Sequence, residues 1–207
     1  MSYAEAFEAA FANPKNTAIF TPDADVNAII KTSYNIEEPF IYTKTQLWDM
    51  EVKKAHFPDK YIRHVVRPGS LHTFNHTKKG HFEYFIRVTD QRKWEDPAGY
   101  ATIIERVCLD HANQKAYFLG IEEVGLPDGR MMTSGKKQPL FHVEHCAVGN
   151  EERPINTWRI VHLTDGRDDS LVAAFKDLGR DPFLRLFNEV YIREDLKKQL
   201  VRKDITA

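Results

Sequence analysis

Four apolar segments follow one another in the middle of the chain, and short runs of turn-forming residues join them in pairs. Residues 100–109 and 115–124 flank the sequence DHAN, and residues 140–148 and 157–164 flank GNEERPIN. β-Branched and aromatic runs separated by Gly, Asn, Asp and Pro are typical of antiparallel hairpins. We therefore expect a chain built around an antiparallel sheet.

Three segments near the N-terminus repeat apolar residues at helical spacing. Each has a clear beginning or end: residues 4–12 stop at Asn13-Pro14, a second segment follows Asp23 or Asp25, and the segment TKTQLWDMEVKKAHF follows Thr43 or Thr45 and ends at Pro58. In this third helix Leu47, Met50 and Lys54 share one side. Glu51, Lys53 and Lys54 are expected to reach solvent.

The C-terminal part is also expected to be helical. Residues 168–170 open one helix, which Gly179 closes, and Asp181-Pro182 opens another. Leu184, Phe187 and Tyr191 give the second helix an apolar stripe. We predict that residues 181–200 form an amphipathic helix packed on the domain or on a partner subunit.

The segments before the first hairpin include two short strands and one segment whose periodicity fits two structures. Residues 62–66 and 70–76 are expected to be strands, with turns at 67–69 and 77–80. Residues 81–93 fit both a strand, with Phe82, Tyr84 and Ile86 alternating, and a helix. The order of helices, strands and helices predicts an α+β fold in one domain, residues 1–207.

The order of elements resembles the NTF2-like, or SnoaL-like, cone-shaped fold. In this interpretation KGHFEYFIRVTDQRKW is the helix before the sheet, and the two strand pairs supply its last strands. The resemblance covers residues 25–165 and leaves residues 166–207 as a helical extension. If residues 81–93 are instead a strand, the chain resembles a START-type helix-grip fold, and either fold encloses an apolar cavity.

Charge and cysteine content narrow the classes of function. The formal net charge is -1, so the basic excess of a nucleic-acid binder is missing. We find no apolar run that spans a bilayer and no secretory signal, and we expect a cytoplasmic protein with no membrane partner. Cys108 and Cys146 lie in apolar runs and are expected to be reduced and structural.

The strand of residues 140–148 carries the strongest candidates for chemistry. Because side chains alternate along a strand, His142 and Glu144 share one face and His145 takes the other. A histidine beside a carboxylate suits general acid–base catalysis, although solvent-exposed or structural roles are equally open. His162 could face the same cavity if its strand is adjacent, and His72 and Asp49 complete the candidate catalytic set.

Aromatic residues reach 12% of the chain and nine histidines accompany them, which favours a ligand cavity. Trp48, Tyr84, Tyr117 and Trp158 are candidate substrate-binding residues. His72, His76, His81 and Glu83 form a second group. It lacks the usual ligand spacings, so we assign no metal site and expect no cofactor.

The leading hypothesis is a cofactor-independent lyase, dehydratase or isomerase that moves protons on a hydrophobic, aromatic small molecule. The NTF2-like resemblance implies this class of reaction. The alternatives are a non-catalytic carrier of START type and a histidine-ligated metalloenzyme. A homo-oligomer, such as a dimer, stays open.

Overall fold

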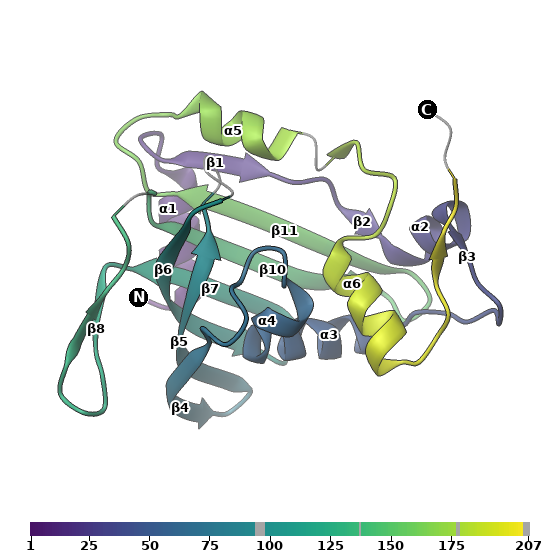
Figure 1. Ribbon diagram of the computed structural model, residues 1–207, viewed down its shortest axis with the longest axis horizontal. Coiled ribbons are helices and arrows are strands. Elements are labelled where there is room, and N and C mark those ends of the chain that lie inside the picture. Colours follow the sequence, from purple (N-terminus) through teal and green to yellow (C-terminus); the bar gives the residue numbers. More distant parts are fainter. Residues whose placement is uncertain (94–97, 137, 177–178, 205–207) are drawn as a thin grey trace.

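The structure is a computed structural model that describes residues 1–93, 98–136, 138–176 and 179–204. Its centre is an eight-stranded antiparallel sheet with the order β1-β11-β10-β7-β6-β5-β4, and β2 pairs with β11 (Figure 1). The strands are β1 (Thr17–Phe20), β2 (Ala24–Asp25), β4 (His72–Lys79), β5 (Phe82–Arg92), β6 (Tyr100–Asp110), β7 (Lys115–Ile121), β10 (Phe141–Gly149) and β11 (Pro154–His162). The predicted α+β class with a curved antiparallel sheet is confirmed.

Four short strands lie outside this sheet. β3 (Tyr34–Asn35) pairs with β12 (Val201–Arg202), which joins the C-terminal segment to the end of an N-terminal helix. β8 (Glu123–Gly125) pairs with β9 (Met131–Thr133), and this hairpin projects from the body (Figure 1).

The three predicted N-terminal helices are present with the expected caps. They are α1 (Tyr3–Ala12), α2 (Val26–Ser33) and α3 (Lys44–His56). Asp25 accepts a hydrogen bond from the backbone of Ala28, and Thr43 forms a capping box with Gln46. Such caps satisfy backbone donors that the first turn leaves unpaired, which fixes where each helix begins.

The remaining helices are short: α4 (Pro58–Tyr61), α5 (Asp169–Lys176), α6 (Leu186–Val190) and a π-helical turn, η2 (Tyr191–Asp195). Within the described part of the chain, no helix is long and apolar enough to cross a membrane. Cys108 and Cys146 are buried and free, as predicted.

Helices pack on both faces of the sheet. On the inner face α3, α6 and the C-terminal segment cover the larger core, in which Leu47, Phe118 and Ile160 are buried. On the outer face α1 packs Phe7 against Tyr117 and Val161. The sheet is therefore covered on both sides, and the two faces of one strand meet different helices.

Residues 81–93 are mainly strand, since β5 runs from Phe82 to Arg92 and pairs with β6 along its whole length. Pairing over that length decides between two periodicities that the sequence allowed. The helix that the NTF2-like resemblance requires is therefore absent. A continuous strand path from β4 to β1 is the arrangement of the helix-grip alternative. Residue 94, the last of the proposed helix, lies outside the described residues.

Three other local expectations are wrong. Residues 62–66 are mainly turn, with a single bridge from Val66 to Gln91. β4 runs through residues 77–79, where we expected a turn. Residues 181–200 do not form one helix, because they divide into an extended stretch, α6 and η2. Residues 177–178 and 205–207 of the C-terminal part lie outside the described residues.

Candidate functional site

A cavity of about 480 Å³ lies between the inner face of the sheet and the C-terminal segment. Its walls come from β5, β6, β7, β10 and β11 on one side, and from α3, α5 and residues 181–187 on the other. Aromatic side chains dominate these walls: Phe118, Phe141, Trp158, Phe175, Phe183 and Phe187. A space of this size with largely apolar walls is typical of small-molecule sites, and its wall also carries charged groups, among them Arg87, Glu105 and Arg202.

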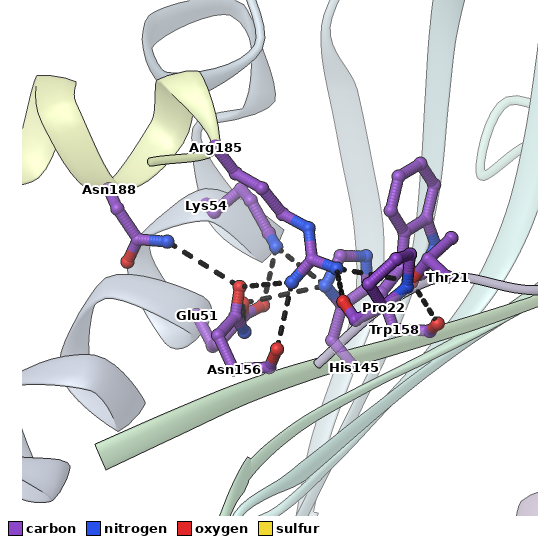
Figure 2. Close-up of polar contacts among 9 residues, drawn as sticks. All are labelled: Thr21, Pro22, Glu51, Lys54, His145, Asn156, Trp158, Arg185 and Asn188. Carbon is purple, nitrogen blue, oxygen red and sulfur yellow. Dashed lines mark hydrogen bonds and ion pairs between the residues drawn. The ribbon is translucent and has the colours of Figure 1, made fainter. Parts of the chain in front are cut away.

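A buried polar cluster, shown in Figure 2, reaches the wall of this cavity through Lys54 and His145. Glu51 and Lys54 come from α3, and His145 comes from β10. The Lys54 Nζ lies 2.5 Å from Glu51 Oε2 and 3.0 Å from His145 Nδ1. Glu51 Oε1 lies 3.4 Å from the same His145 nitrogen and accepts a 2.9 Å hydrogen bond from Asn156.

Arg185 covers this cluster from the C-terminal segment (Figure 2). It donates to the backbone and side-chain oxygens of Asn156 at 2.8 and 3.2 Å. Its other nitrogen donates to Thr21 at 3.1 Å and to the Pro22 carbonyl at 2.6 Å. These contacts fix the segment before α6 against β11, so that it forms a wall of the cavity.

Burial sets the charge state of the cluster. It lowers the pKa of Lys54 to about 8, against the opposing attraction of Glu51. Burial and the Lys54 charge lower the pKa of His145 to about 4. Burial alone would raise the pKa of Glu51, but Lys54 and His145 hold it well below its usual range. Near pH 7 the cluster is therefore an ion pair beside a neutral imidazole.

The tautomer of His145 follows from this charge state. The Lys54 ammonium has only protons to donate, so Nδ1 of His145 accepts its hydrogen bond. In a neutral imidazole the other nitrogen then carries the proton. Among the described residues Nε2 has no hydrogen-bond partner, so His145 offers an N–H donor at the cavity wall.

A second buried ion pair lines the cavity beside this cluster. The Arg87 Nη2 is 2.7 Å from Glu105 Oε2, and Arg87 also donates to the Ala55 carbonyl at the end of α3 at 3.0 Å. The guanidinium stacks over Phe118 at 4.5 Å. The cavity thus brings cationic groups, Lys54, Arg87 and Arg185, together with aromatic surface.

Two of the predicted site residues lie together in this cavity. His145 and Trp158 are paired across β10 and β11, and their rings stack with centroids 5.5 Å apart. Both line the cavity. The stack holds the imidazole plane against the sheet.

Four predicted residues lie on the outer face instead. His142 and Glu144 share that face, as predicted from strand alternation. Glu144 binds Arg159 at 2.6 Å, and Tyr117 packs against α1. Tyr84 contacts Tyr3 of α1. Since the inner cavity opens on the other side of the sheet, these four residues do not line it.

The last four predicted residues are dispersed. His162 is fully buried behind Phe141 and Phe175, and burial lowers its pKa to about 4. Asp49 accepts a 2.6 Å hydrogen bond from the Tyr191 hydroxyl. Trp48 packs edge-on against His111, and His72 is exposed on β4. None of the four lines the cavity described above.

Glu51, Lys54 and Arg185 were missed as site residues. Glu51 and Lys54 were expected to reach solvent, yet both are buried. The signal was present, because position 51 follows Leu47 by four residues and position 54 follows Met50 by four. Charged residues on the apolar stripe of a helix remain there only when they are paired.

Comparison with known proteins gives no family for this chain. No protein-family model matches the sequence, and no curated protein matches it. A solved structure, the Zhui aromatase/cyclase from Streptomyces sp. R1128, is similar over 77% of this chain and 94% of that one, with 10% sequence identity and a TM-score of 0.45. The chemistry of the site therefore has to follow from the residues of this chain.

Proposed function

We propose that this protein is an enzyme that transfers protons on a hydrophobic, aromatic small molecule bound in the inner cavity. The class is a lyase, dehydratase or isomerase whose acid–base groups belong to the chain itself. One observation carries the proposal: a buried Glu51–Lys54–His145 cluster ends at an aromatic-walled cavity of about 480 Å³.

The cluster supports a proton relay. His145 Nε2–H gives its proton to a substrate oxygen while Lys54 gives one to Nδ1, so the imidazole ends neutral and Lys54 ends as an amine. A Lys54 pKa of about 8 brings this proton close to the working range of a general acid. Glu51 remains an anion throughout and holds Lys54 in place. The reverse transfer makes the same groups a base.

The cavity walls favour a flat, apolar substrate with a carbonyl or phenolic oxygen. Stacked surfaces such as Phe118 and Trp158 match an aromatic ring, and the His145 donor and the Lys54 charge match an oxygen on which negative charge develops.

The test is exchange of carbon-bound protons adjacent to a carbonyl. Wild-type protein is incubated in deuterated water with β-tetralone and related aryl ketones, and exchange is followed by proton NMR. We expect acceleration by the wild type, with one limb of the pH–rate profile near pH 8, the pKa of Lys54. We expect its loss in His145→Gln and Lys54→Met.

A carrier gives a different outcome. It binds these ketones in the cavity, detected by quenching of tryptophan fluorescence, to which the cavity residue Trp158 contributes, but leaves the exchange rate at the buffer value. Binding without exchange across the whole panel would reject the enzyme proposal in favour of the START-type carrier.

A further inference from the structure

A second cluster of ligand-type side chains lies outside the cavity, at the β4 edge of the sheet. His56 ends α3, His76 lies in β4 and Glu83 lies in β5. One ligand atom from each of the three lies within 4.8 Å of the others, and His56 Nε2 is 3.1 Å from Glu83 Oε1. The sequence grouped His76 with Glu83, but it placed His72 and His81 beside them in place of His56.

A break in β4 directs His76 into this cluster. The register between β4 and β5 shifts between Phe74 and Thr77, and Asn75 adopts a φ of 56°. A bulge of this kind re-aims the side chains beside it, and asparagine tolerates the left-handed conformation better than most residues. His76 and His56 then both stack on Phe85, with ring centroids 5.1 and 4.7 Å from it.

The second carboxylate oxygen of Glu83, Oε2, contacts two other side chains. Its side chain is 10% exposed, and Oε2 lies 3.3 Å from both His111 Nε2 and Lys78 Nζ. His111 comes from the turn between β6 and β7. A hydrogen bond to the second oxygen of a ligating carboxylate is a common feature of metal sites, because it fixes the orientation of the ligand. The Lys78 side chain is 75% exposed, so it can move into water when a cation takes its place.

We propose that His56, His76 and Glu83 bind a divalent transition metal of the zinc class, with His111 orienting Glu83. Two imidazoles and one carboxylate are ligands that zinc prefers, and they leave a position for water. His56 Nε2 and Glu83 Oε1 are already 3.1 Å apart, so bonds of about 2.0–2.2 Å require mainly the exposed His76 to move closer. The metal would tie the end of α3 to the β4–β5 hairpin. The proton relay through His145 does not use this site, so either proposal can fail without the other.

The test is a titration of the purified protein, stripped of metal by a chelator, with Zn²⁺ in competition with a chromogenic chelator. We expect one Zn²⁺ per chain. His76→Ala should weaken binding by about a hundredfold or more, since it removes a ligand and not merely a supporting contact. His76 is exposed, so this variant keeps its fold. The matched control is His72→Ala on the same strand, which should bind as the wild type does.

Two further measurements separate a defined site from general affinity of histidines for zinc. His111→Phe should weaken Zn²⁺ binding by about 10- to 100-fold. Co²⁺ should give the visible absorption of a low-coordinate nitrogen–oxygen site, and this band should be lost in His76→Ala. The proposal is overturned if the wild type binds no stoichiometric Zn²⁺, if His76→Ala binds equally well, or if His72→Ala loses as much affinity.

Discussion

The two faces of β10 carry two charged clusters that differ in their access to water. On the inner face Glu51 and Lys54 have side-chain exposures of 0% and 4%, and they surround a neutral His145 at the cavity. On the outer face Glu144 is 4% exposed, but its partner Arg159 is 27% exposed and continues to Glu8 at the surface. β10 thus faces a buried ion pair of α3 on one side and takes part in a partly hydrated ion pair on the other.

This difference separates a cluster that can move protons from one that holds an element in place. Desolvation brings the pKa of Lys54 down to about 8, where the group can release and recover a proton. Burial would lower the pKa of Arg159, but its hydrogen bonds to the carboxylates of Glu8 and Glu144 outweigh burial and raise it, so Arg159 keeps its proton at any relevant pH. Arg159 also lies over Phe7 and Phe11 of α1, at 4.9 and 5.1 Å from the ring centroids. The outer cluster therefore fastens a helix.

The comparison predicts its largest effect in turnover. His145→Gln keeps the size of the side chain but removes the titratable ring, so proton exchange on the aryl ketones should slow by about 10²- to 10⁴-fold. His142→Gln, three residues away on the outer face, should leave the rate unchanged. Equal losses in both variants, measured by the same NMR assay, would break the assignment of chemistry to the inner face.

A second prediction concerns stability. Lys54→Met leaves Glu51 buried without its cation and should lower the free energy of unfolding by about 3–5 kcal/mol in urea titrations. The adjacent Lys53 is the matched control: its salt bridge to Asp49 is 2.7 Å long but 37% and 46% exposed. Lys53→Met should cost about 1 kcal/mol or less. If the two variants lose the same free energy of unfolding, the contribution of the Glu51–Lys54 pair to stability does not depend on its charges.

The pH dependence of stability sharpens the same contrast. The pKa of His145 is lowered from 6.5 to about 4 in the folded protein, so between these values the unfolded chain binds a proton that the folded chain does not. Stability therefore falls as pH drops from 6.5 to 4, by on the order of 3 kcal/mol for this group.

His145→Gln should remove that share of the fall in urea titrations run at several pH values. His162, whose pKa is also lowered to about 4, keeps its own share. The control is His72→Gln, which removes an exposed histidine of β4 and should leave the fall as it is in the wild type. A fall of unchanged size in His145→Gln would show that this ring is hydrated in the folded state.

Much of the fold was predictable because local signals dominate it. The caps at Asp25 and Thr43 and the two hairpins around residues 110–114 and 150–153 follow from short-range chemistry. Periodicity did not decide whether residues 81–93 form a strand or a helix, because their pairing with β6 is a long-range effect. The C-terminal segment was predicted to bury Leu184, Phe187 and Tyr191, and it does. It does not form one helix, because long-range contacts such as that of Arg185 with Asn156 hold its first part in an extended conformation.

The site was less predictable than the fold. Strand alternation correctly separated His145 from His142 and Glu144, but no local rule says which face of β10 meets a cavity. The two partners of His145 are distant in the sequence: Lys54 lies 91 residues away and Glu51 lies 94 residues away. Only the packing of α3 across the sheet brings them together.

The smallest predicted effect tests the outer cluster directly. Arg159 donates to Glu144 Oε1 at 2.8 Å and to Glu8 Oε1 at 2.6 Å. In Glu144→Gln the acceptors of Arg159 are therefore the amide oxygen of the new side chain and the carboxylate of Glu8. We expect a loss of about 1–2 kcal/mol in the free energy of unfolding, since the two contacts with Arg159 weaken and the 3.6 Å ion pair with Lys115 is lost, while Arg159 keeps Glu8 as its partner. Glu8→Gln, at the exposed end, should cost about 0.5 kcal/mol or less, and raised salt should reduce it further. A loss in Glu144→Gln as large as that in Lys54→Met would mean that the outer cluster is as dry as the inner one, and the contrast between the two faces of β10 would no longer explain where the chemistry lies.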